Sequence, residues 1–431
     1  MPSVYIGLSL DALHHGHINL IKVGRSYGDV TIGLITDAAL AKNKRLPFLN
    51  WDQRKAVAEN LVGVVKVIEQ NEWDYSVNIK ALKPDFMIHG DNWDYEPPYL
   101  RTNAVEALAQ YGGKLIETPH TKGISSSAMA KSILDVGTTP DYRRQTLQRL
   151  LNCKPLSQFL EAHSPISALI AENVCYEQDG STNFFDGFWS SSLTDSTEMG
   201  KPDIEALDIN TRLSNINNIF DVTTKPLIMD ADTGGKAEHF AINVRSMERL
   251  GISAVIIEDK TGLKKNSLFG NDVDQSQEEP IIFGDKIRNA RDKLVSNDFM
   301  IIARIESLIL EKGLEDALER ARIYVDHGAH GIMIHSREKS PDEIFKFSDA
   351  YKKEHPDIPL VVVPTSFNTV VKQEFEDAGV NILIYANHML RSSYPAMWNT
   401  ALGILKHGRT EEIEHNLISI NEILDLIPGT K

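Results

Sequence analysis

The chain has few cysteines, no long apolar run and no excess of positive charge, and each shortage excludes a class of protein. Its 431 residues include only two cysteines, Cys153 and Cys175, too few for a disulfide framework or a zinc cluster. No apolar stretch approaches the ~20 residues that a transmembrane helix needs. The formal net charge of −15 argues against nucleic acid or an anionic membrane as a partner.

The N-terminus and the length set further expectations. The first residues run directly into a strand-like segment, without the basic region and cleavage site of a signal peptide. Scarce cysteine is typical of a reducing compartment, so we expect a cytoplasmic protein. A chain of 431 residues is too long for one ordinary core, which predicts two domains.

The first half alternates strand-like and amphipathic helical segments. The predicted strands are Val4–Leu10, Asp29–Ile35, Phe86–His89 and Lys114–Glu117, and the predicted helices are Ile18–Tyr27, Gln53–Leu61 and Asn103–Gln110. Strands separated by helices indicate a doubly wound α/β domain with a parallel sheet. The pattern breaks at a glycine and a proline in residues 135–140, which predicts domains of residues 1–138 and 139–431.

The second half repeats one rhythm of short apolar runs with helical patterns between most of them. The runs are Ala168–Ala171, Phe184–Phe188, Pro226–Met229, Ala254–Ile257, Phe299–Ala303, Gly331–Ile334, Leu360–Val363 and Ile382–Tyr385. These eight strand–helix units predict a TIM-type (β/α)8 barrel, whose active site lies at the carboxyl ends of the strands.

Polar residues follow several of these runs. Asp230 and Asp232 follow the third, Glu258 the fourth, Arg304 the fifth and His335 the sixth. Three carboxylates from neighbouring strands suit Mg²⁺, and an arginine suits a phosphoryl group. Each residue alone also has an ordinary structural interpretation, such as a solvated turn for Asp-x-Asp. Their shared position on one face of the barrel favours the functional interpretation.

Two loops at this face carry groups that bind anions. Trp189 is followed by three serines, among them Ser191 and Ser192, whose amides and hydroxyls suit a substrate carboxylate. The segment after Glu258 is rich in cationic and polar side chains, namely Lys260, Lys264, Asn266 and Ser267. A charged surface loop is the plain alternative for this segment.

The pattern Glu-Asp-Lys-x-x-x-Lys-x-Asn-Ser over residues 258–267 resembles the signature of the phosphoenolpyruvate mutase/isocitrate lyase superfamily. The resemblance covers almost all of the second half. It implies that Asp230, Asp232 and Glu258 hold Mg²⁺. It further implies a gating loop bearing Lys264, Asn266 and Ser267, an essential aspartate at Asp203, and phosphoryl contacts from Arg304 and His335. Family members commonly have glycine where this chain has Ser192.

The resemblance implies conversion of phosphoenolpyruvate to phosphonopyruvate, with formation of a carbon–phosphorus bond. A phosphonopyruvate hydrolase or a carbon–carbon lyase of the same superfamily is the alternative. Asn266 favours the mutase, because the related hydrolase departs at that position, and the Lys-Lys-Cys-Gly-His motif of the lyases does not occur here. Barrels of this superfamily are usually oligomers, so we expect a homo-oligomer.

A second set of candidate residues lies in the first half. His14-His-Gly-His17 falls between the first strand and first helix, where imidazoles and a helix N-terminus can receive phosphate. Lys44 lies in a basic loop downstream, and Ser125 and Ser126 begin a later helical stretch. A solvated turn and an ordinary helix cap are the structural alternatives.

Residues 3–132 resemble the cytidylyltransferase-like nucleotidyltransferases through the His-x-Gly-His motif and the segment Ile124-Ser-Ser126. The resemblance implies that His14 and His17 stabilise the triphosphate of CTP. It implies that Lys44, Ser125 and Ser126 contact phosphate oxygens. The implied reaction transfers CMP to a small phosphonate. A nucleotide-binding module without turnover is the alternative.

Overall fold

The structure, a computed structural model, describes residues 1–91, 93, 97–119, 121, 137–178, 181–262 and 264–427. Packing divides the chain into a unit Met1–Ala386 and a unit Asn387–Lys431, and each is described by itself. The predicted serines Ser125 and Ser126 lie outside the described residues. None of the helices described is both long and apolar enough to cross a membrane.

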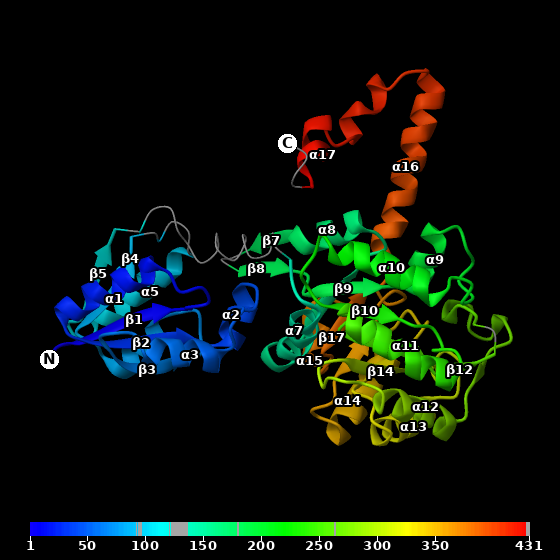
Figure 1. The fold of residues 1–431 in the computed structure, drawn as a ribbon, viewed down its shortest axis with the longest axis horizontal. Coiled ribbons are helices and arrows are strands. Elements are labelled where there is room, and N and C mark those ends of the chain that lie inside the picture. The colour runs from blue at the N-terminus through cyan, green and yellow to red at the C-terminus, as the bar shows by residue number, and fades with distance from the viewer. Residues whose placement is uncertain are drawn as a thin grey trace. The chain divides into compact units, whose positions relative to one another are not determined.

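The N-terminal region is a five-stranded parallel sheet in the order β3-β2-β1-β4-β5, with helices in its crossovers (Figure 1). Its elements are β1 (Ser3–Leu8), α1 (His15–Tyr27), β2 (Asp29–Ile35), α2 (Asp37–Asn43), α3 (Trp51–Glu59), β3 (Val64–Gln70), α4 (Ser76–Leu82), β4 (Phe86–Gly90), α5 (Pro98–Ala109) and β5 (Lys114–Thr118). This confirms the doubly wound α/β fold. The central β1 brings the loop before α1 to the carboxyl edge of the sheet.

Sequence patterns missed one strand of this sheet. β3 is an edge strand, and most of its side chains are exposed or only half-buried. Lys66 and Glu69 interrupt its apolar residues. An edge strand buries little surface and can carry charge, so it lacks the apolar run that marks a central strand.

The second region is a closed parallel barrel in the order β10-β11-β14-β15-β16-β17-β6-β9. The barrel strands are β6 (Ser157–Glu161), β9 (Gly187–Ser190), β10 (Leu227–Asp230), β11 (Ala254–Glu258), β14 (Met300–Ile305), β15 (Gly331–Ile334), β16 (Leu360–Val362) and β17 (Ile382–Tyr385). Among the helices, α11 (Ala237–Leu250), α12 (Pro280–Arg291), α13 (Leu314–Asp326) and α14 (Asp342–Glu354) pack in sequence outside the strands (Figure 1).

The remaining elements of this region lie before the barrel or in its loops. They are α7 (Pro140–Cys153), α8 (Pro165–Asn173), the hairpin β7 (Cys175–Gln178) and β8 (Ser181–Phe184), α9 (Ser192–Glu198), α10 (Ile209–Phe220), the short pair β12 (Lys260–Thr261) and β13 (Ser276–Gln277), the 3-10 helix η2 (Ser267–Asp272) and α15 (Lys372–Asp377). Buried side chains from all eight strands fill the barrel interior, as in other (β/α)8 barrels.

The barrel was predicted correctly, but two of its strands were misplaced. The run Ala168–Ala171, predicted as the first strand, lies in helix α8, and the first strand is β6. The second run, Phe184–Phe188, begins at the end of hairpin strand β8 and reaches only the first two residues of the barrel strand β9. The other six runs overlap barrel strands. An apolar run of four residues fits a buried helix as well as a strand, so periodicity alone could not separate them.

The unit Asn387–Lys431 contains α16 (His388–His407), the 3-10 helix η3 (Glu411–Asn416) and α17 (Ile420–Asp425). None of the α16 side chains is buried, and several large apolar ones are exposed: Tyr394, Met397, Trp398, Leu402 and Leu405.

Candidate functional site

The carboxyl ends of β10, β11 and β14 bring the predicted acids and arginine together. Glu258 and Arg304 are direct neighbours in the register of β11 and β14, and Asp230 ends the adjacent β10. All three are buried, with exposed fractions of 9% or less. Arg304 Nη2 lies 3.2 Å from Glu258 Oε2. The predicted residues Asp230, Glu258 and Arg304 therefore lie together at this end of the barrel.

Asp230 is held by hydrogen bonds from two directions. Its Oδ1 accepts the Asp232 amide at 3.0 Å, and its Oδ2 accepts the Ser192 hydroxyl at 2.8 Å. Burial acts to raise the pKa of Asp230, but Lys264, Arg304 and other cations outweigh it and lower the pKa to about 2. Asp230 is therefore a carboxylate throughout the physiological range, ready to hold a cation.

Glu258 has the buried, incompletely satisfied carboxylate oxygens expected of a residue that binds a metal ion. Both of its carboxylate oxygens are buried without a hydrogen-bond donor, although Lys260 and Arg304 lie 3.2 Å away. Burial raises the pKa of Glu258 to about 7 against the lowering effect of those two cations. A divalent ion would satisfy these oxygens, so the donor set fits Mg²⁺.

Among the described residues, no three His, Cys, Asp or Glu side chains are grouped so that they could hold a metal ion. Mg²⁺ often takes only one or two carboxylates together with waters and substrate oxygens, and the set of Asp230, Asp232 and Glu258 stays a prediction. Lys264 Nζ donates to Asp232 Oδ1. The ammonium thus neutralises one of the predicted metal-binding acids.

The segment from β12 to β13, which carries the predicted gating loop, contacts these acids. We call its described residues, 260–262 and 264–277, the lid. Lys264 Nζ donates to Asp203 at 2.7 Å and to Ser192 at 2.6 Å, and Asn266 donates to the other Asp203 oxygen at 3.1 Å. Burial lowers the pKa of Lys264, but the surrounding carboxylates raise it well above its usual value. The Asp203 carboxylate is therefore the shared hydrogen-bond acceptor of Lys264 and Asn266.

The other side of the lid reaches the arginine. Ser267 Oγ donates a hydrogen bond to Glu306 at 2.5 Å and accepts one from Lys260 Nζ at 2.9 Å. Arg304 donates to Ser267 at 2.6 Å and to His335 Nδ1 at 3.0 Å. Burial and Arg304 lower the pKa of His335, so the ring is neutral. His335 Nδ1 also lies 3.3 Å from Glu306 Oε1, so Arg304 and Glu306 together hold the ring in place.

The serine segment differs from its sequence-based interpretation at one position. Ser192 stands where family members commonly have glycine. In the structure its hydroxyl joins Asp230 to Lys264, and Ser191 beside it is the N-cap residue of α9 but makes no side-chain capping hydrogen bond. The Trp189 side chain packs in the barrel core.

We predict that Ser192→Ala lowers turnover by the barrel about tenfold, because it removes hydrogen bonds to both a carboxylate and an ammonium group. Ser196→Ala, a buried substitution on the same helix, is the control and should leave turnover unchanged. Steady-state kinetics of the two variants measure this. Equal rates for Ser192→Ala and the wild type would contradict the bridging role.

Sequence reasoning missed Arg212, a fully buried arginine on α10 behind the acids. Its Nε donates to Asp195 at 2.9 Å, and Nη1 donates to the main-chain oxygen of Asp230. Nη1 also lies 3.6 Å from Asp232 Oδ2. A helical arginine carries no sequence signal for this role, because the contacts arise only when α10 packs on the barrel.

Arg212→Met should lower the free energy of unfolding by about 3–5 kcal/mol, because it leaves the buried Asp195 carboxylate without its counter-charge. Arg245→Met, at an exposed arginine of α11, should change it by less than about 0.5 kcal/mol. Urea denaturation measures both variants. An unfolding free energy for Arg212→Met equal to that of Arg245→Met would exclude the charge-balancing role.

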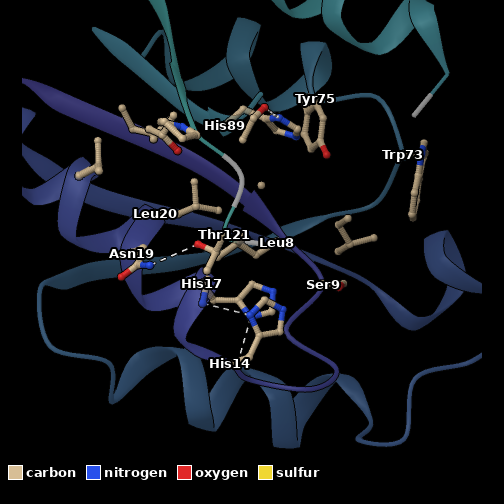
Figure 2. Close-up of a pocket in the computed structure, with 18 of the residues that line it drawn as sticks. Leu8, Ser9, His14, His17, Asn19, Leu20, Trp73, Tyr75, His89 and Thr121 are labelled. Atoms are coloured by element: carbon tan, nitrogen blue, oxygen red, sulfur yellow. Dashed lines mark hydrogen bonds between the residues drawn. The ribbon is translucent and has the colours of Figure 1, made fainter. Parts of the chain in front are cut away.

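The N-terminal region contains a cavity of about 320 Å³ at the carboxyl edge of its sheet (Figure 2). The predicted residues His14, His17 and Lys44 all line it. Its lining also includes residues that sequence reasoning did not select, among them Trp73, Tyr75, His89 and Thr121. Aromatic residues near strand ends are common in cores, so no specific sequence signal marks these residues.

The two histidines cap helix α1 with their own rings. His14 Nδ1 accepts the Gly16 amide at 3.1 Å, and His17 Nδ1 accepts the His14 amide at 3.3 Å (Figure 2). Both ring protons therefore lie on Nε2. Burial and the neighbouring His14 lower the pKa of His17 to about 4, so it is a neutral donor at pH 7. A Cβ at position 16 would lie 2.8 Å from the His14 ring, so this turn needs glycine.

Lys44 lies across the same cavity. It ends α2, and its Nζ lies 4.8 Å from the centre of the Trp73 ring. This geometry holds the ammonium by a cation–π contact at the cavity wall. The cavity therefore combines two imidazole donors and one cation, a set suited to phosphate oxygens.

Comparison with known proteins separates the same two regions. The family described as phosphoenolpyruvate phosphomutase matches residues 147–405, and the family described as cytidylyltransferase-like matches residues 5–132. The first match spans more than half of the chain.

Individual relatives match the barrel region. The phosphoenolpyruvate phosphomutase of Tetrahymena pyriformis is 33% identical over 282 residues, which are 65% of this chain and 89% of that protein. The phosphonopyruvate hydrolase of Variovorax sp. is 34% identical over 66% of this chain and 94% of that protein. A crystal structure of phosphoenolpyruvate phosphomutase from Streptomyces platensis subsp. rosaceus superimposes with a TM-score of 0.60 and 35% identity, covering 66% of this chain and 94% of that one.

Proposed function

Because this chain belongs to the phosphoenolpyruvate phosphomutase family and also carries a cytidylyltransferase-like domain, we propose that it is a bifunctional enzyme of phosphonate biosynthesis. The barrel would isomerise phosphoenolpyruvate to phosphonopyruvate. The N-terminal domain would transfer CMP from CTP to a small phosphonate. The observation that carries the first activity is that Lys264 and Asn266 of the lid both donate hydrogen bonds to Asp203 beside the buried acids.

The isomerisation moves a phosphoryl group within one molecule. The oxygen–phosphorus bond of phosphoenolpyruvate breaks, its electron pair remains on the enolate of pyruvate, and the enolate methylene carbon then bonds to phosphorus. Arg304 and His335 would hold the phosphoryl oxygens, and the serine segment at Ser191 would hold the carboxylate. No proton is transferred overall, so positioning and charge stabilisation account for catalysis.

Mg²⁺ would be held by Asp230, Asp232 and Glu258, and when bound it would supply positive charge at the enolate oxygen. The buried Glu258 oxygens support this assignment, because among the described residues they form ion pairs but no hydrogen bond. Lys264 must then leave Asp232 or share it with the metal. In either case the closed lid excludes water, which could otherwise capture the phosphoryl group.

Phosphorus NMR tests the barrel's activity directly. Because phosphoenolpyruvate traps pyruvate in its enol form, equilibrium favours it, and the assay is best begun from phosphonopyruvate. A mutase will produce phosphoenolpyruvate. Release of inorganic phosphate and pyruvate instead would assign the barrel to the second candidate, a phosphonopyruvate hydrolase, which the 34% identity with the Variovorax hydrolase favours. Asn266 and its contact with Asp203 support the mutase.

The unfavourable equilibrium also supports the second activity. Phosphonopyruvate accumulates only if later steps consume it, and a fused domain acting on a downstream phosphonate contributes to that removal. The cavity with His14, His17 and Lys44 would bind the triphosphate of CTP. Pyrophosphate release from CTP with 2-hydroxyethylphosphonate or 2-aminoethylphosphonate tests the transfer. Binding of CTP without release would mean a module that binds nucleotide only.

We also propose a cytoplasmic homo-oligomer. The exposed apolar side chains of α16 support association, because a monomer would leave them in water. Light scattering coupled to size-exclusion chromatography tests this, and a mass of 48.2 kDa in solution would contradict it.

A further inference from the structure

The aspartate that follows Glu258 is the centre of a buried hydrogen-bond cluster outside the substrate site. Asp259 is fully buried, and its Oδ1 accepts the main-chain amide of Glu306 at 3.0 Å. Its Oδ2 accepts Tyr324 at 2.7 Å, Gln277 at 2.9 Å and Arg320 at 3.3 Å. We call these four side chains, Asp259, Gln277, Arg320 and Tyr324, the lid anchor.

The lid anchor joins the two ends of the lid. Asp259 immediately precedes the lid, and its main-chain oxygen accepts the amide of Glu278 at 2.8 Å. Arg320 donates to the Glu278 oxygen at 2.9 Å. Lys260 pairs with Gln277 between β12 and β13. The entry and exit of the lid are therefore fixed to one carboxylate.

The same cluster fixes the lid to the strand that carries the phosphoryl-binding arginine. Asp259 accepts the amide of Glu306, and Gln277 donates to the Ser307 hydroxyl at 3.0 Å. The Glu306 carboxylate in turn accepts hydrogen bonds from Ser267 of the lid and from Arg304. A shift of the lid root would therefore move Ser267 away from both groups.

Tyr324 and Arg320 support the cluster from outside the barrel wall. Both lie on α13, and Arg320 donates to the Tyr324 hydroxyl at 2.9 Å. Neither side chain hydrogen-bonds to a residue that we assign to substrate or metal. An effect of the Tyr324 hydroxyl on the reaction must therefore pass through Asp259 or Arg320.

We propose that the lid anchor sets how long the lid stays closed and thereby decides whether the phosphoryl group reaches the enolate or water. This inference rests on the proposed mutase activity. From phosphonopyruvate, the carbon–phosphorus bond breaks and leaves its electron pair on the enolate. Phosphorus then bonds either to the enolate oxygen, giving phosphoenolpyruvate, or to a water oxygen. In the second case a water proton reaches the enolate carbon, and pyruvate and inorganic phosphate form.

The test variant is Tyr324→Phe, which removes one hydroxyl and leaves the ring in place. Its matched control is Tyr351→Phe, because Tyr351 is equally buried on α14 but its hydroxyl has no hydrogen-bond partner among the described residues. Phosphorus NMR of phosphonopyruvate turnover gives the ratio of inorganic phosphate to phosphoenolpyruvate. We expect Tyr324→Phe to raise this ratio at least fivefold and Tyr351→Phe to leave it unchanged. Loss of stability without a route for water would slow both products equally.

Hydrogen exchange of residues 264–277 provides a readout that does not depend on the reaction. Tyr324→Phe should accelerate exchange there severalfold relative to Tyr351→Phe. Gln277→Leu, which acts from the lid side, should do the same if Tyr324→Phe fails to fold. Wild-type protein that forms only inorganic phosphate would overturn the mutase proposal, and the exchange rates would still test the anchor. Unchanged exchange and an unchanged product ratio in folded variants would overturn the anchor itself.

Discussion

Asp203→Ala will reduce isomerisation about a thousandfold, equivalent to roughly 4 kcal/mol of transition-state stabilisation. Asp203 accepts hydrogen bonds from both Lys264 and Asn266, so its carboxylate is the fixed point that the lid closes upon. Without it, Lys264 retains Asp232 and Ser192 but Asn266 loses its acceptor. Phosphorus NMR of phosphonopyruvate conversion, with Mg²⁺ present, measures the loss.

Two further variants separate charge from folding. Asp203→Asn keeps the shape but removes the charge that balances Lys264, so its activity should also fall by at least a hundredfold. Asp208→Asn, an exposed change later in the same loop, preserves the helix cap and should be fully active. Thermal unfolding should be the same for all three variants within a few degrees. A fully active Asp203→Ala would contradict the assignment of the barrel site.

The acids of the barrel were predictable because parallel strands deliver their carboxyl ends to one face. Asp230, Glu258 and Arg304 each follow an apolar run that is buried on both sides, and such runs are the clearest signal in this sequence. For the lid, the sequence signature predicted which residues are functional but not which residue they contact. The signature supplied Lys264 and Asn266, but their common partner Asp203 is about 60 residues away in sequence and was found through the family resemblance.

The first barrel strand illustrates what local sequence cannot decide. β6, Ser157-Gln-Phe-Leu-Glu161, has polar residues at three of its five positions, yet all but Gln158 are buried in the closed barrel. The Ala168–Ala171 run is more apolar, but Ser164 caps a helix there and Pro165 occupies its first turn. Attention to this cap would have corrected the assignment. The polar strand itself pairs with β17 and β9, which are distant in the chain.

Arg212 and the lid anchor could not be found from sequence for the same reason. Both depend on helices that pack against the barrel, and a buried arginine in a helix has the same local pattern as an exposed one. Ser192 presents the opposite case. Its departure from the family's glycine was visible, but whether the hydroxyl would crowd the pocket or bind was decided by Asp230 and Lys264.

His17→Asn will lower CMP transfer about a thousandfold, the largest effect that we expect in the N-terminal domain. The neutral His17 ring is fixed by its Nδ1, which leaves Nε2–H as a donor in the cavity. Asparagine is too short to place a donor at that position. Because negative charge accumulates on the triphosphate as pyrophosphate leaves, this donor acts mainly in the transition state. Pyrophosphate release from CTP and the accepted phosphonate measures the rate.

His15→Asn is the matched control, since His15 lies in the same motif but is exposed and does not line the cavity. It should retain full transfer activity, and both variants should keep the barrel's isomerisation rate, because the two sites use separate residues. CTP should still bind to His17→Asn with an affinity within about tenfold of the wild type, as a transition-state contact requires. Transfer that survives His17→Asn would remove the histidines from the reaction, and Lys44 would then be the remaining described cation for the triphosphate in this cavity.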